Sequence, residues 1–114
     1  MALDQNQVKE LAGLYPKSGV LEDGGVEFIL ISPLLLPPGC EPASVEGLLC
    51  PTPRDGYTSR LFLSSKITHR GRGQNWNSNG VMIAGRQWWA VSWKTEQENL
   101  TLLGMVLAHL QAFK

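Results

Sequence analysis

The sequence QNWNSNGVMIAGRQWWAVSWK, residues 74–94, organises this chain. It contains all four tryptophans of the protein and carries three asparagines in its first half. A segment so polar at one end and so aromatic at the other needs a scaffold to hold it. We therefore expect the flanking chain to form that scaffold and this segment to present the functional surface.

Length and composition indicate a single globular domain spanning residues 1–114. A chain of 114 residues can bury a substantial core without disulfides or metal ions, and 43% of its residues are hydrophobic. Ten basic and ten acidic residues give zero net charge, which disfavours nucleic acid and acidic membranes as partners. The first residues lack the features of a signal peptide, and no apolar run has membrane-spanning length, so we expect a cytoplasmic protein.

The two cysteines and two histidines lack the spacing of a structural zinc site, and we predict no metal and no cofactor. In a reducing cytoplasm both thiols are expected to be free, although one disulfide is possible. Cys40 is interpreted as a loop residue and Cys50 as a small buried residue. His109 is interpreted as a polar edge residue near the end of the last helix.

Local patterns predict an α+β fold with an N-terminal helix, a four-stranded antiparallel meander, a loop with a small hairpin, and a C-terminal helix. Asp4 begins the first helix, because Asp4 and Gln7 resemble a capping box and Pro16 prevents continuation. The apolar face of this helix comprises Val8, Leu11, Ala12 and Tyr15. The meander is expected to comprise strands at residues 19–22, 26–32, 44–50 and 61–67.

Residues 26–32 are apolar on both faces, which predicts a central strand covered on both sides. Residues 34–36 are interpreted as its far end, bent at Pro33. A polar loop is expected at residues 68–80, before two short strands at residues 81–83 and 87–91.

The last helix is expected to begin at Thr95, because Thr95 and Glu98 match a capping box. Its apolar residues are Leu100, Leu103, Val106, Leu107, Leu110 and Phe113. We expect both helices to pack against one face of the sheet.

The tryptophans at positions 88, 89 and 93 are expected to pack rather than to bind. On a strand, Trp89, Val91 and Trp93 share one face, whereas Trp88, Ala90 and Ser92 share the other. We expect one face to meet the core and the other to carry Trp88 beside the Ser92 hydroxyl.

A hydrolase triad is conceivable, because Ser92, His69 and Asp55 supply the residue types. A triad is recognised by its geometry, however, and the sequence has no GxSxG, phosphate-loop or HExxH motif. We therefore do not favour a hydrolase.

The segment HRGRGQNW, residues 69–76, combines basic side chains with one tryptophan. Arginine contacts phosphate and tryptophan stacks on bases, so single-stranded RNA binding is one hypothesis. The other is a solvated, glycine-rich loop without a ligand, and the zero net charge favours this loop.

The order of elements resembles the ubiquitin-conjugating-enzyme superfamily, which includes inactive variants and RWD domains. That family has a proline-rich loop where this chain has LCPTPRDGY, residues 49–57, and a His-Pro-Asn motif where it has THRG, residues 68–71. The sequence NSNG, residues 77–80, is similar to the Asn/Gly turn just before the family's catalytic cysteine. No cysteine follows Cys50, so the resemblance implies a variant that cannot form the usual thioester.

More closely, the chain resembles a bacterial branch of this superfamily with a Gly-Arg-x-Trp…Ser signature. Gly85, Arg86, Trp88 and Ser92 match that signature. The branch is associated with a ubiquitin-like protein, a ThiF-type activating enzyme and a deconjugating peptidase. The resemblance therefore implies a ubiquitin-like modifier and an activating enzyme as partners in a bacterial conjugation pathway.

Two roles follow from the resemblance, and the sequence leaves open whether the chain is an enzyme. In the first, Ser92 takes the acyl group as an oxyester, with His69 as base and Asn79, or else Asn75 or Asn77, as donor to the oxyanion. Lys94 lies two residues from this serine. In the second, the domain only docks the modifier or the activating enzyme. The simplest interpretation of Ser92 is a strand-end hydroxyl bonded to the backbone; between the two roles, we favour the acyl carrier.

Overall fold

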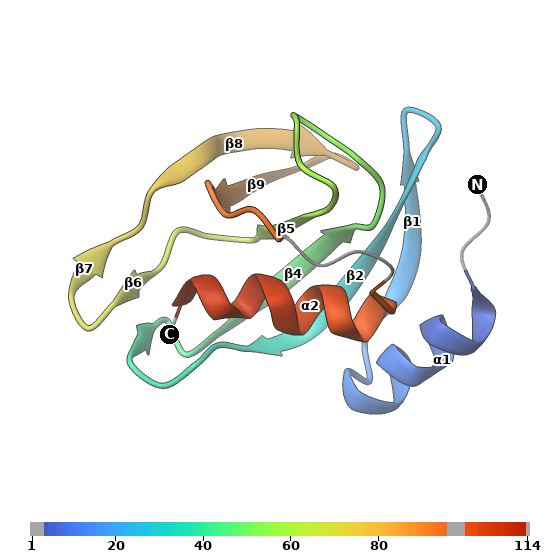
Figure 1. Cartoon of the computed structure of the whole chain (residues 1–114), viewed down its shortest axis with the longest axis horizontal. Helices are drawn as coiled ribbons and strands as arrows, with labels where there is room; N and C mark the ends of the chain where they lie inside the picture. Colours follow the sequence, from blue (N-terminus) through green and yellow to red (C-terminus); the bar gives the residue numbers. More distant parts are fainter. Residues whose placement is uncertain (1–3, 96–99, 114) are drawn as a thin grey trace.

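The computed structural model describes residues 4–95 and 100–113. It has an α+β architecture, in which helices pack against a mainly antiparallel sheet (Figure 1), and this predicted class is confirmed. In chain order the elements are α1 (Gln5–Leu14), β1 (Gly19–Asp23), β2 (Val26–Leu35), β3 (Cys40–Glu41), β4 (Ser44–Cys50), β5 (Arg60–Leu63), β6 (Thr68–His69), β7 (Arg72–Gly73), β8 (Trp76–Ile83), β9 (Arg86–Val91), α2 (Leu102–Leu110) and the 3-10 helix η1 (Gln111–Phe113).

The main sheet has six strands in the order β1-β2-β4-β5-β9-β8, and all neighbouring pairs are antiparallel. Strands close to the four expected ones lie side by side in it, but β3 separates β2 from β4 in the chain, and β5 ends at Leu63 instead of continuing to residue 67. The expected strand count is wrong, because the β8–β9 hairpin joins the same sheet where Trp89 pairs with Leu63. Residues 74–94 are therefore part of the scaffold as well as a candidate surface.

A second sheet, in the order β3-β6-β7, takes up part of the polar loop predicted for residues 68–80. Arg70 and Gly71 have φ angles of 52° and 80° and form the tight turn between β6 and β7. A pair of residues with positive φ suits a two-residue hairpin, but the usual sequence signal is absent because arginine, rather than asparagine, aspartate or glycine, precedes Gly71. Strand β8 begins soon afterwards, at Trp76.

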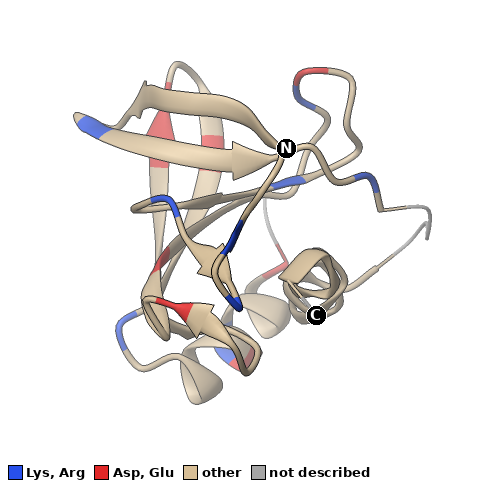
Figure 2. Ribbon diagram, turned by 90° about the vertical axis from the view of Figure 1, so that its left-hand side faces the viewer, with Lys and Arg blue, Asp and Glu red and all other residues tan. Residues whose placement is uncertain are grey.

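Strand β2 is covered on both faces, as predicted, because the sheet has a hydrophobic cluster on each side. The first cluster lies between the sheet and the helices and includes Leu11, Ile29, Ile31, Leu63 and Val106. The second includes Phe28, Leu48 and Phe62 of the meander with Ile83, Trp88 and Ala90 of the β8–β9 hairpin. Figure 2 shows the helices on one side of the sheet and the hairpin folded over the other.

Helix α1 begins as predicted, with Asp4 as its N-cap. The backbone N–H groups of Asn6 and Gln7 donate to the Asp4 carboxylate. The Gln7 side chain does not complete a capping box in the described contacts; its Oε1 accepts the N–H of Leu102, 2.9 Å away. This bond ties the first helix to the start of α2, and Leu11 is the buried residue of the expected apolar face.

Helix α2 begins later than predicted and buries a different face. Its N-cap is Thr101, whose hydroxyl accepts the N–H of Gly104, whereas the predicted partner Glu98 lies outside the described residues. Thr95 instead lies with its hydroxyl 3.3 Å from that of Thr58. The buried residues are Leu102, Val106, His109 and Leu110, and Leu107 is 50% exposed. A helix this uniformly apolar has no polar stripe to show which side meets the core.

No helix in the described part of the chain is long and apolar enough to cross a membrane.

Candidate functional site

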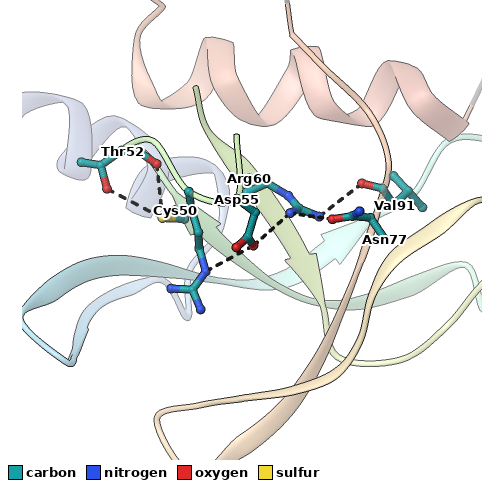
Figure 3. A network of polar contacts seen from close by, with 7 residues as sticks. Cys50, Thr52, Asp55, Arg60, Asn77 and Val91 are labelled. Atoms are coloured by element: carbon teal, nitrogen blue, oxygen red, sulfur yellow. Dashed lines mark hydrogen bonds and ion pairs between the residues drawn. The ribbon is translucent and has the colours of Figure 1, made fainter. Parts of the chain in front are cut away.

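A buried arginine lies beneath the best candidate site. Arg60 of β5 is 1% exposed, and its guanidinium nitrogen Nη1 donates to Asp55 Oδ2 at 3.2 Å and to Asn77 Oδ1 at 3.0 Å. Its Nη2 donates to the carbonyl of Val91 at 3.4 Å (Figure 3). A buried charge requires such partners, so Arg60 joins the loop before β5 to both strands of the β8–β9 hairpin.

The same guanidinium supports the residue that contacts Ser92. The carbon Cζ of Arg60 lies 4.3 Å from the centroid of the Tyr57 ring. The Tyr57 hydroxyl in turn lies 3.0 Å from Ser92 Oγ, so the Ser92 hydroxyl bonds a side chain rather than the backbone. The backbone N–H of Ser92 donates to the carbonyl of Asn75 at 2.7 Å. Ser92 is therefore exposed, and hydrogen bonds of both its backbone N–H and its side-chain hydroxyl fix its position.

These residues border a polar hollow of about 420 Å³, which we call the Ser92 hollow. It is lined by Asp55, Gly56, Tyr57, Asn77, Ser92 and Lys94. Asp55 and Gly56 have positive φ and form the turn expected from the Asp-Gly pair. The hollow therefore combines two hydroxyls, an amide, a carboxylate and an ammonium group.

Of Ser92, His69 and Asn79, the three residues predicted to act together, only Ser92 lines this hollow. His69 lies in the small sheet, where its Nε2 is 3.2 Å from the carbonyl oxygen of Pro38, and it lines a different hollow. Asn79 is exposed on β8 opposite Trp89 and lines neither of these two hollows. Asn77, two residues earlier on the strand, is the asparagine that lines the hollow with Ser92.

The tryptophans mostly build the interior. Trp88 is completely buried, with its Nε1 donating to the carbonyl of Ile83 at 3.2 Å, so it does not lie on the surface beside Ser92. Trp76 is half-buried against the first cluster, which weakens the idea that it stacks on RNA bases. Trp93 is 36% exposed, and its Nε1 donates to the carbonyl of Ala108. The prediction that Trp88 packs rather than binds is confirmed. The prediction that Trp88 lies on a surface beside the Ser92 hydroxyl is wrong.

Sequence reasoning missed Arg60 and misjudged His109. His109 is 5% exposed, and its Nε2 lies 2.9 Å from Ser59 Oγ, so it is a core residue rather than an edge residue. Burial, together with the charge of Arg60, lowers the pKa of His109 to about 4. Burial also lowers the pKa of Arg60, against the opposing effect of the Asp55 carboxylate. The sequence signal for the burial of Arg60 was its place as the first residue of an apolar strand. An arginine there is either exposed at the end of the strand or buried and paired with a carboxylate.

Both cysteines are free thiols and both are buried. Cys50 is 1% exposed, as expected for a small buried residue. Cys40 is a strand residue rather than a loop residue; its thiol lies 3.8 Å from the carbonyl oxygen of Phe113, and burial raises its pKa. Neither thiol lies on the Ser92 hollow.

Comparison with models of protein families, with characterised proteins and with solved structures finds no match for this chain. Within residues 4–95 and 100–113, no group of three or more His, Cys, Asp and Glu side chains could hold a metal ion.

Proposed function

We propose that this protein works in a bacterial ubiquitin-like conjugation pathway, where the Ser92 hollow receives the activated C-terminal tail of the modifier. Its partners are then the modifier and a ThiF-type activating enzyme, and its location is the cytoplasm. The order helix, meander, hairpin, helix supports this proposal, as does the Gly-Arg-x-Trp…Ser segment. The observation that carries it is the pair of hydroxyls, on Tyr57 and Ser92, at one polar hollow.

The hollow suits an extended peptide tail. Hydroxyl groups both donate and accept hydrogen bonds, so Tyr57 and Ser92 can pair with peptide N–H and C=O groups. Asn77 accepts from Arg60 through its Oδ1, which leaves its amide nitrogen to donate. Lys94 supplies a positive charge near the tail's acyl end. A concave site with a few polar groups is the usual form of a ligand site.

The acyl transfer proceeds on Ser92. Its Oγ bonds to the carbonyl carbon of the modifier's C-terminal thioester, and the carbon–sulfur bond breaks. The serine proton passes through the Tyr57 hydroxyl and ends on the departing sulfur, so no further reactant is consumed. The Asn77 amide donates to the oxyanion, in place of the expected Asn79, and His69 takes no part.

A model acyl donor tests this step. A peptide ending in Gly-Gly, prepared as a C-terminal thioester, is incubated with the protein, and the intact mass is measured before and after hydroxylamine. An oxyester on Ser92 is removed by hydroxylamine, whereas an amide on Lys94 survives. We expect a labile adduct in the wild type and in the Ser44→Ala control, and no labile adduct in Ser92→Ala.

The docking role is the second outcome of the same design. The peptide is also prepared as an unreactive amide and titrated against the protein while the amide resonances of Asp55, Ser92 and Lys94 are followed. Binding without an adduct supports docking over acyl transfer. If the thioester leaves no adduct and the amide peptide shifts none of these resonances, the Ser92 hollow is not the tail site.

A further inference from the structure

A second hollow, of about 700 Å³, lies beside the small sheet. It is lined by Pro37, Pro38, His69, Arg70 and Arg72, and we call it the Arg70 hollow. Its lining combines the apolar rings of two prolines with two guanidinium groups and an imidazole. Glu41, on the neighbouring strand β3, does not line it.

The guanidinium groups of the two arginines on this hollow differ from those of the other described arginines in their ion pairing. Arg54, Arg60 and Arg86 each form an ion pair with a carboxylate. Within residues 4–95 and 100–113, by contrast, the guanidinium groups of Arg70 and Arg72 have neither a carboxylate nor a hydrogen-bond acceptor. Two unpaired guanidinium groups on one hollow form a local positive site in a chain whose net charge is zero.

The backbone holds this site in an unfavourable conformation. Arg70 has a φ of 52°, in the left-handed region that favours glycine, asparagine and aspartate at the first position of such a turn. Strained positions of this kind concentrate at functional sites. An arginine here costs stability that glycine would not, and the side chain it provides lines the hollow.

Close packing around Gly39 constrains His69 and the base of Arg70. Gly39 has a φ of 96°, and a Cβ at that position would lie 3.0 Å from Arg70 Cγ and 3.1 Å from His69 Nε2. His69 is further held by the carbonyl oxygen of Pro38, 3.2 Å from its Nε2, and the Arg70 N–H donates to the Gly39 carbonyl at 2.8 Å. These contacts hold the His69 ring and the base of the Arg70 side chain, whereas the guanidinium groups of Arg70 and Arg72 are exposed to a ligand.

We propose that the Arg70 hollow binds a phosphate ester with a planar or apolar substituent, such as a nucleoside monophosphate. A phosphate presents enough oxygens to accept from two guanidinium groups at once, which a single carboxylate does less well. The proline rings give the substituent an apolar surface, and the volume is that of a small-molecule site. This site is separate from the Ser92 hollow and does not rest on the conjugation pathway.

Calorimetric titration with adenosine 5′-monophosphate tests the proposal, with adenosine as the ligand control. We expect the monophosphate to bind at millimolar concentrations or below and adenosine not to bind. Arg70→Gly removes the guanidinium and suits the positive φ, so this variant folds; it and Arg72→Gln each weaken binding by about tenfold. Lys9→Gln, on α1, removes the same charge elsewhere and leaves the dissociation constant unchanged.

A 5′-phosphorylated single-stranded oligonucleotide distinguishes the two sources of the phosphate. Comparable binding of both ligands, with shallow salt dependence, assigns the site to a free nucleotide. Tighter binding of the oligonucleotide, with a steep salt dependence that Arg72→Gln reduces, assigns the same phosphate site to a nucleic-acid chain. The proposal fails if neither ligand binds, if the arginine variants bind as the wild type does, or if a tri-aspartate peptide binds better than the monophosphate.

Discussion

Tyr57 and Ser92 stand 35 positions apart in the chain, yet their side-chain oxygens lie 3.0 Å from each other at the edge of a polar hollow. The loop that carries Tyr57 is held by the buried guanidinium of Arg60, and the same guanidinium bonds the carbonyl of Val91, next to Ser92. One arginine thus contacts both the Tyr57 ring and the residue that precedes Ser92.

Tyr57→Phe is expected to slow acylation of Ser92 without unfolding the protein. The phenylalanine ring can still lie on Arg60, so only the hydrogen bond is lost, and the free energy of unfolding falls by about 1 kcal/mol or less. The rate of the hydroxylamine-labile adduct falls because the proton relay is missing. Rates and urea denaturation are compared with those of Ser92→Ala; an unchanged acylation rate would rule out the relay.

Arg60→Ala is expected to lower the free energy of unfolding by about 2–4 kcal/mol, because it opens a cavity and leaves the Val91 carbonyl and Asn77 without their partner. Arg60→Lys keeps the charge but loses the forked geometry of the guanidinium. Its free energy of unfolding is expected to lie between those of the wild type and Arg60→Ala. Chemical denaturation measures both. Arg72→Ala, which removes an exposed guanidinium, serves as the control and is expected to change stability by about 0.5 kcal/mol or less.

Stability is expected to fall in acid because of His109, whose pKa in the folded protein is about 4 compared with an ordinary value of 6.5. Between these pH values His109 is protonated in the unfolded chain but stays neutral in the folded core. The contribution is therefore complete above pH 6.5 and is lost as the pH falls towards 4, by about 2–3 kcal/mol. Urea denaturation of the wild type and His109→Gln gives the measurement: the wild type should lose stability faster, and parallel pH curves would contradict this assignment.

Trp88→Ala is expected to be among the most damaging substitutions of residues 74–94. The side chain is fully buried in the second cluster, so its removal is expected to cost about 3–5 kcal/mol. Trp93→Ala, at a residue that is 36% exposed, should cost clearly less. Thermal denaturation followed by circular dichroism compares the two, and equal shifts in Tm would contradict the greater contribution expected of the buried Trp88 ring.

Gly39→Ala is expected to destabilise the protein by about 1–3 kcal/mol, because an alanine there has an unfavourable positive φ and approaches Arg70 and His69. Gly19→Ala is the matched control: its φ is not in the left-handed region, and a Cβ there meets no atom within 4 Å. The control should leave stability unchanged or slightly raised. Denaturation midpoints of the two variants test the difference.

Several elements could be predicted from the sequence because their signals are local. Asp4 caps a helix, the Asp-Gly-Gly turn closes the β1–β2 hairpin, and Asp55-Gly56 forms a turn. Each depends on the conformational preference of two or three neighbouring residues. The same reasoning failed at the turn of Arg70 and Gly71, where an arginine occupies a conformation that its own preferences disfavour.

The candidate site was predicted less completely than the strands that carry it. Ser92 and Lys94 were identified as neighbours in the chain, with His69 and Asn79 as the favoured companions, Asn77 as an alternative to Asn79, and Asp55 only as part of a disfavoured triad. In the structure Asp55, Tyr57 and Asn77 line the hollow with Ser92 and Lys94, because β9 pairs with β5 and Arg60 bonds across that junction. Pairing between strands distant in the chain leaves no periodic trace in either strand.

Local chemistry in the chain thus accounts for the α+β class, the β1–β2 hairpin, the first helix cap and the buried character of β2. The tertiary arrangement alone accounts for the β8–β9 hairpin joining the main sheet, the burial of Trp88, Arg60 and His109, and the separation of the Ser92 and Arg70 hollows. The physical reason is that turn and strand preferences act over a few residues. The partner of a buried charge or ring is chosen by which surfaces the folded chain brings into contact.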